Sequence, residues 1–166
     1  MGPVVAGRRD HIRSRAAAVG LWSEPSIEIH SYAAFLNGRG FTRVYTFAGE
    51  PGFVSHDLGL DVAVILGMRV GNRLADLIDT LRNLSADPPL IAIAVGNPDP
   101  ELTSRILACG VDRAFPLCPP NFAFYRQVVT AAHHALISRT QRLTEATPGG
   151  RTGWTDDSPT TPVYRR

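Results

Sequence analysis

Few side chains in this chain have the type and position that catalysis or metal binding would need. Glu24 and Asp61 each stand beside a short apolar run, and paired carboxylates are a common set for general acid–base work. Cys118 also follows an apolar run, where a thiolate could act as a nucleophile. His133 and His134 are adjacent, but neighbouring helical residues point about 100° apart and cannot easily face one metal ion.

A structural role is the simpler interpretation of each candidate. Glu24 suits a helix N-terminus, where the helix dipole favours negative charge, and Asp61 suits the edge of a strand. Cys109 stands where a helix should end and is expected in the core. No cation is placed obviously enough to lower the pKa of Cys118. The sequence therefore predicts neither an enzyme nor a cofactor or metal site.

Alternating apolar runs and helical patterns must position these side chains. We expect strands at residues 16–21, 43–47, 62–66, 90–95 and 113–117. Between them the pattern predicts a helix capped by Ser26, a weak helix at 50–60 and an amphipathic helix at 74–84. Further helices should be capped by Asp99 and Asn121. This order predicts an α/β fold, a doubly wound five-stranded parallel sheet with helices on both faces, as in flavodoxin.

The composition divides the chain into three parts. Residues 1–14 form a basic N-terminal extension, and residues 15–143 carry the alternating pattern. Residues 144–166 are rich in Thr, Pro and Gly and have no core-forming period, which is typical of a flexible tail.

Several short segments resemble the receiver domains of response regulators, which have the CheY-like form of this fold. Ser23-Glu24-Pro25 before a helix resembles the end of their acidic first loop. Residues 61–82 (DVAVILGMRVGNRLADLIDTLR) can be laid on their third strand and following helix without a gap. Residues 98–101 (PDPE) and 110–112 (GVD) match the entry and exit of their fourth helix. The resemblance covers about residues 16–140.

The resemblance implies a phosphorylation site that this chain lacks. Receivers hold Mg²⁺ with acids after strands one and three, phosphorylate the latter acid, and contact the phosphate with a hydroxyl and a lysine. The corresponding positions are Trp22 and Ser23, Leu66 (or Gly67), Ala94 (or Val95), and Leu117 (or Cys118). We expect Trp22 to fill the vacated cavity, with neither aspartyl phosphorylation nor magnesium binding.

Aromatic residues suggest where the chain makes contacts instead. Receivers commonly pair through the fourth helix, fifth strand and fifth helix, and this region contains Phe115, Phe122, Phe124 and Tyr125. An exposed aromatic patch would favour a homodimer interface. The alternative is that two or three of these rings simply cover the sheet.

Composition sets the remaining limits. The 166 residues carry a net charge of +2, and all 17 cations are arginine. Two cysteines suggest a reducing compartment, and no apolar run approaches the ~20 residues of a membrane span. We therefore expect a cytoplasmic protein with no membrane partner.

These observations favour a phosphorylation-independent signalling or regulatory module that acts through protein contacts, including self-association. The alternative is an atypical transcription regulator or a shortened form of one. A helix-turn-helix domain could begin at Arg142-Leu143-Thr144, but the sequence after it lacks the three amphipathic helices that such a domain needs. DNA contacts of this chain would be weak, resting on Arg8, Arg9, Arg13 and Arg15 or on Arg165 and Arg166. A third hypothesis is that the emptied pocket binds a small apolar ligand.

Overall fold

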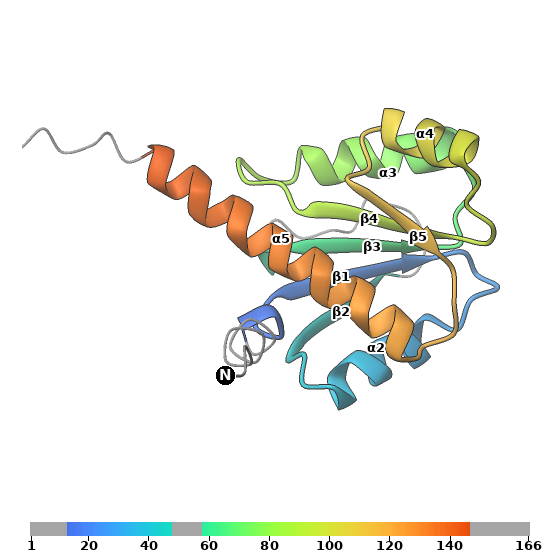
Figure 1. Ribbon diagram of the computed structural model, residues 1–166, viewed down its shortest axis with the longest axis horizontal. Coiled ribbons are helices and arrows are strands. Elements are labelled where there is room, and N and C mark those ends of the chain that lie inside the picture. Colours follow the sequence, from blue (N-terminus) through green and yellow to red (C-terminus); the bar gives the residue numbers. More distant parts are fainter. Residues whose placement is uncertain (1–12, 48–57, 147–166) are drawn as a thin grey trace, which may run out of the picture.

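The structure, a computed structural model, describes residues 13–47 and 58–146 and contains one five-stranded parallel sheet. The strand order is β2-β1-β3-β4-β5 (Figure 1), which confirms the predicted fold class. The strands are β1 (Ala18–Ser23), β2 (Arg43–Phe47), β3 (Val62–Leu66), β4 (Leu90–Val95) and β5 (Arg113–Pro116). The helices are α2 (Ile29–Gly38), α3 (Asn72–Arg82), α4 (Pro100–Ala108) and α5 (Phe122–Ala146).

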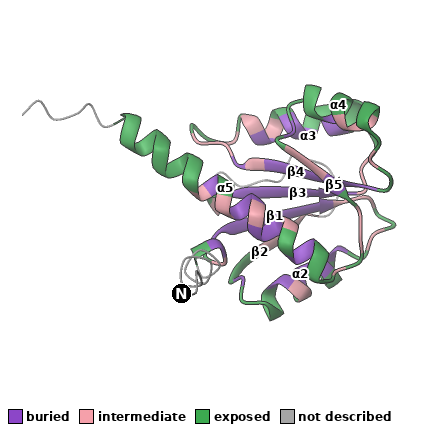
Figure 2. Cartoon of the chain, viewed as in Figure 1, coloured by how far each residue is buried: buried purple, intermediate pink, exposed green. Residues whose placement is uncertain are grey.

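Side chains of the central strands alternate between two apolar cores. In β3, Val64 and Leu66 face a core covered by α2 and α5. Ile65 faces a second core, which α3 and α4 cover. All five residues of β3 are buried, as expected for a parallel strand packed on both faces. Figure 2 shows this buried centre in purple.

Local capping explains where two of the helices begin. The Asp99 side chain accepts a hydrogen bond from Leu102 N at 2.7 Å, and Pro100 occupies the first turn of α4. Asn121 Oδ1 accepts from Phe124 N at 3.2 Å at the start of α5. Both predicted caps are thus confirmed. Ser26 is not a cap, because α2 begins only at Ile29, after Glu28.

The chain between β2 and β3 is described only in part. Most of the weak helix predicted at residues 50–60 lies outside the described residues. Gly59 and Leu60, which follow, lead into β3 without helical structure.

Helix α5 is longer than the sheet that it covers. Its 25 residues end at Ala146, beyond the domain boundary predicted at residue 143. Its burial ends earlier, at Ala135, and residues 137–146 are all exposed. Figure 1 shows this half of α5 projecting past the sheet. None of the described helices combines the length and the apolar character that crossing a membrane requires.

The last residue of the predicted N-terminal extension is packed in the structure. Ser14, assigned above to the extension, is only 1% exposed. A short turn leads from it into β1, with Ala17 N donating to Ser14 O at 3.2 Å. Residues 1–12 and 147–166, which include most of the predicted extension and tail, lie outside the described residues.

Candidate functional site

The carboxyl ends of the strands meet at one edge of the sheet, where ligands bind in folds of this class. Ser23 is paired in register with Leu66, and Leu66 with Ala94. Leu117 follows β5, and its N–H donates to Val95 O at 2.7 Å. The backbone therefore brings together the positions that the receiver resemblance singled out. We call this region the carboxyl edge.

Hydrocarbon side chains occupy the carboxyl edge. Leu66 and Ala94 are fully buried in the core under α2 and α5. Ile27 and Leu117 pack against the same core from the loops. Gly67, with φ +70°, lies directly beneath Ile27: a Cβ added there would collide with the Ile27 side chain and contact Leu117 at 3.5 Å. The loops are thus closed over the sheet by apolar packing.

This edge does not fit the magnesium ion that a receiver fold implies. Mg²⁺ demands oxygen ligands in near-octahedral geometry and retains much of its water. Leu66 and Ala94 offer no oxygen from their side chains and admit no solvent. Within residues 13–47 and 58–146, no group of three or more His, Cys, Asp or Glu side chains is arranged to hold a metal ion.

Trp22 does not fill the receiver cavity, so that expectation was wrong. Strand side chains alternate, and Trp22 therefore faces the α3 and α4 core while Leu21 faces the other. Its ring stacks on Phe47, with centroids 4.3 Å apart and planes at 10°. It lies over Gly20, where an added Cβ would be 2.6 Å from the indole. The side chains that pack over Gly67 at the carboxyl edge are instead Ile27 and Leu117.

Cys118 is held in an environment that suppresses its reactivity. Tyr32 Oη donates to the Cys118 carbonyl oxygen at 2.6 Å, which fastens the loop after β5 to α2. Burial raises the pKa of the Cys118 thiol above its ordinary value, and burial also raises the pKa of Tyr32. A thiol with a raised pKa is a poor nucleophile near neutral pH. Cys109, expected in the core, is exposed.

The two carboxylates considered as a pair lie at opposite edges of the sheet. Glu24 follows β1 at the carboxyl edge, where its N–H donates to Leu66 O at 3.4 Å. Asp61 precedes β3 at the other edge, which we call the amino edge. The structure therefore excludes a catalytic pair formed by these residues. The structural role preferred for Asp61, at the edge of a strand, agrees with its position before β3, whereas Glu24 lies before α2 and not at its N-terminus.

The histidine pair shows no convergence on a common point. The rings of His133 and His134 are 6.4 Å apart between centroids. His134 Nδ1 lies 3.1 Å from Arg113 Nη1, so this ring contacts a cation on β5. His30 is exposed on α2, and His56 lies outside the described residues. The three of these histidines that the structure describes therefore provide no metal-binding arrangement.

The predicted aromatic interface is mostly core. Phe115, Phe124 and Tyr125 are at most 4% exposed, because they form the layer between α5 and the sheet. Phe124 packs edge-on against Tyr32 at 4.9 Å. Only Phe122 of the four is exposed, at 58%. The alternative interpretation, that these rings cover the sheet, is correct for three of the four.

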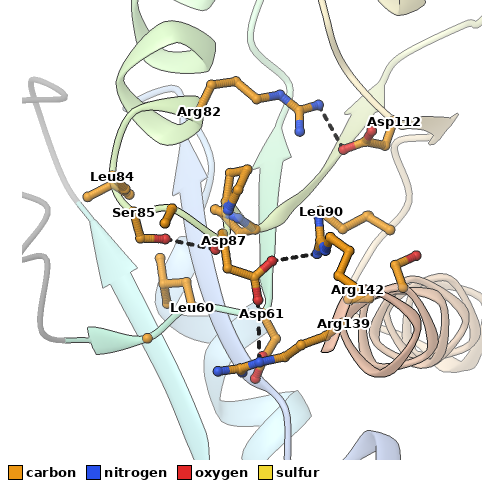
Figure 3. A pocket seen from close by; sticks show the side chains of 16 residues that line it. Leu60, Asp61, Arg82, Leu84, Ser85, Asp87, Leu90, Asp112, Arg139 and Arg142 are labelled. Carbon is orange, nitrogen blue, oxygen red and sulfur yellow. Dashed lines mark hydrogen bonds and ion pairs between the residues drawn. The ribbon is translucent and has the colours of Figure 1, made fainter. Parts of the chain in front are cut away.

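Sequence analysis missed the polar cluster at the amino edge (Figure 3). A hollow of about 420 Å³ opens there, between α5 and the loops before β3, β4 and β5. Asp61 and Asp87 line it together with Arg139 and Arg142 of α5. One signal was available: an aspartate stands immediately before the apolar strand β3. Nothing in the sequence linked it to an arginine 78 positions later.

A smaller hollow, of about 330 Å³, lies near the carboxyl edge. It is bounded by the loop after β1 and the start of α2, from Ser23 to His30. It stands beside the closed loops, over residues of α2, and contains no buried charged side chain. We assign no ligand to it.

Comparison with known proteins identifies the fold. Neither a protein-family model nor a curated protein matches the sequence. A putative pilus assembly-related protein from Burkholderia pseudomallei aligns with TM-score 0.55 and 14% identity over 71% of this chain and 92% of that chain. A putative pilus assembly protein from Burkholderia thailandensis aligns with 0.54 and 16% over 72% and 98%.

A signal receiver domain of a DNA-binding response regulator from Colwellia psychrerythraea also aligns. Its TM-score is 0.53 and its identity 20%, over 68% of this chain and 95% of that chain. At these identities the similarity concerns the fold alone. The described part of this chain has a receiver-like fold, as the sequence resemblance implied.

Proposed function

We propose that this chain is a receiver-like signalling or regulatory module that works without phosphorylation, through protein contacts that include self-association. The observation that carries the proposal is the apolar carboxyl edge. The receiver resemblance puts the phosphoryl acceptor at Leu66 or Gly67, and Leu66 is fully buried beside Ala94. A hydrocarbon side chain cannot accept a phosphoryl group.

The packing around Leu66 supports this proposal beyond the missing acceptor. Restoring an acid alone would place a charge among apolar atoms, and desolvating an unpaired carboxylate is strongly unfavourable. Ile27 also lies over Gly67, in the loop that follows β3. The carboxyl edge is therefore built as core, and any signal must pass through another surface.

Exposed apolar side chains on α4 and α5 favour protein contact as the remaining activity. Leu107 of α4 is 45% exposed, and Phe122 and Ile137 of α5 are 58% and 42% exposed. Large apolar groups in solvent are typical of interfaces when they are contiguous. These three are separate: Leu107 is on the helix that covers the other face of the sheet, and Phe122 and Ile137 are about 22 Å apart along α5 by helical rise. Phe122 is therefore the candidate contact. Phe122 is also supported from below, since its ring stacks on Tyr125 with centroids 5.9 Å apart.

The first test is phosphorylation itself. We expect no phosphate adduct by intact-mass measurement after the full chain is incubated with acetyl phosphate and Mg²⁺. A conventional receiver treated in parallel should gain the adduct, which controls for the donor. Heat-denatured chain controls for adventitious modification. A stable adduct on the native chain alone would contradict the proposal.

The second test concerns self-association. We expect light scattering to show a mass above that of the monomer as concentration rises, and Phe122→Ser to shift the equilibrium toward monomer. Ala123→Ser, a change at the neighbouring exposed position, is the matched control. A strict monomer at all concentrations would remove self-association from the proposal.

A further inference from the structure

The projecting half of α5 needs a source of order other than apolar burial. Residues 137–146 are all exposed, although they continue the helix without a break. Helical segments this short are marginal in water without tertiary contacts. Two arginines in this stretch, Arg139 and Arg142, reach back to the amino edge of the sheet (Figure 3).

These arginines belong to one chain of ion pairs, which we call the Asp61 network. Arg139 Nη1 lies 2.9 Å from Asp61 Oδ1, and its Nε lies 3.4 Å from Asp87 Oδ2. Arg142 Nη2 lies 2.6 Å from the other oxygen of Asp87, a buried atom, at ion-pairing distance but without hydrogen-bond geometry. On the far side, Arg43 Nη2 lies 3.4 Å from Asp61 Oδ2. Its members are Arg43, Asp61, Asp87, Arg139 and Arg142.

Asp61 anchors this network in the body of the domain. Its side chain is 5% exposed, and it accepts a hydrogen bond from Ala18 N at 2.8 Å. Its backbone pairs with Ala18 O on one side and with Leu90 N on the other. The carboxylate that holds Arg139 is therefore fixed relative to β1, β3 and β4. Asp87, in contrast, has a side chain that is 41% exposed.

The hollow beside the network does not select a charged ligand. Three guanidinium groups and three carboxylates line it, from Arg82, Arg139 and Arg142 and from Asp61, Asp87 and Asp112. Each of these arginines lies within ion-pairing distance of an aspartate of the hollow. The charges cancel locally, so the arrangement favours a role within the chain over capture of an anion or a cation.

We propose that the Asp61 network is a salt-sensitive strut that keeps the projecting half of α5 helical and fixes its direction from the sheet. Arg139 bridges the buried and the exposed aspartate, and Arg142 adds a second hold one helical turn later. Salt screens exposed pairs more than buried ones. The outer pair, Asp87–Arg142, therefore loosens first as ionic strength rises, while Asp61–Arg139 persists.

Hydrogen exchange of the full chain, measured by mass spectrometry, tests the strut. In Asp87→Asn we expect amides of residues 139–146 to exchange about three- to fivefold faster at low salt, the effect of losing exposed pairs. Asp112→Asn is the matched control, because Asp112 lines the same hollow but pairs with Arg82 of α3. It should leave these amides unchanged.

A salt series and a second variant complete the test. In the parent chain, 1 M NaCl should accelerate exchange of the same amides, and Asp87→Asn should show a smaller salt effect. Arg139→Gln, a change at a half-exposed side chain, should accelerate exchange more than Asp87→Asn does, because it removes the pair with buried Asp61, which Asp87→Asn keeps, and leaves only Arg142–Asp87. Unchanged exchange at 139–146 in both variants would overturn the strut. The measurement is made on dilute chain, so it is independent of self-association and of phosphorylation.

Discussion

The two edges of the sheet differ in chemistry although the same strands form both. At the carboxyl edge, where related folds place their ligands, Leu66 and Ala94 are buried hydrocarbons. At the amino edge, Asp61 joins a network of arginines that reaches α5. The polar groups of this domain are therefore concentrated where they connect elements, and the edge that usually carries chemistry has become core.

The amino edge repeats one hydrogen-bonding device. Asp61 stands before β3 and accepts from Ala18 N in the neighbouring strand at 2.8 Å. Asp112 stands before β5 and accepts from Ile91 N in its neighbouring strand, also at 2.8 Å. Each carboxylate thereby satisfies a backbone donor near the start of a strand. An aspartate that immediately precedes a strand of this fold can therefore have a structural role, because it pairs with a backbone N–H of the neighbouring strand.

The largest effect should come from placing charge at the carboxyl edge. Leu66→Asp should lower the free energy of unfolding by about 4 kcal/mol or more, because it buries an unpaired carboxylate and removes apolar contacts. Leu66→Met, which nearly conserves volume, should cost less than about 1.5 kcal/mol. Urea denaturation followed by circular dichroism measures both. If Leu66→Asp were as stable as Leu66→Met, the edge would be hydrated and the contrast between the edges would fail.

The fold was predictable because apolar runs and helix caps are local signals. The run at residues 62–66 predicted β3 at its observed bounds, and Asp99 and Asn121 cap their helices as expected. The apolar character of the carboxyl edge was also readable, since it depends on which residue types stand at strand ends. At Ser26 the local signal was misleading: a serine there suits a helix cap, but α2 begins only at Ile29 and has no side-chain cap.

The sequence could not predict which way side chains face or which charged residues far apart in the chain form ion pairs. Trp22 was placed at the correct strand end but on the wrong face, because a shift of one residue in the strand reverses the side chain. For the four aromatic residues the sequence left two interpretations open, an exposed patch or a cover for the sheet, and three of the rings face the sheet. The ion pair between Asp61 and Arg139 depends on how α5 crosses the sheet, which no local pattern encodes.

Substitutions at Asp61 should separate its ion pairs with Arg43 and Arg139 from its hydrogen bond with Ala18 N. Asp61→Asn retains an acceptor for Ala18 N but loses the charge, so we expect a loss of about 1 kcal/mol, discounted because Arg43 and Arg139 are half-exposed. Asp61→Ala also leaves the buried N–H without its partner and should cost about 2–3 kcal/mol. Chemical denaturation measures both losses. Equal losses in the two variants would show that the hydrogen bond contributes nothing.

Asp112 makes the equivalent hydrogen bond before β5, so its alanine variant can be compared with Asp61→Ala. Its side chain is 39% exposed, so water can replace part of what Asp112→Ala removes. We expect that variant to lose about 1 kcal/mol or less, below the loss in Asp61→Ala. A larger loss at Asp112 would place the anchor of the amino edge at β5 instead of β3.

The smallest effect tests how tightly the carboxyl edge is closed. Burial raises the pKa of the Cys118 thiol, so at pH 8 iodoacetamide should modify exposed Cys109 about tenfold faster than Cys118. Peptide mapping measures the two rates separately, and Cys109→Ser isolates the slower one. Because the folded chain favours the neutral thiol, the group has no effect on stability at low pH. It destabilises the fold as pH rises above the ordinary pKa of cysteine, where the unfolded chain ionises first. Equal rates at pH 8 would show that the loop after β5 opens to solvent, and that the carboxyl edge is less closed than the packing of Ile27 and Leu117 implies.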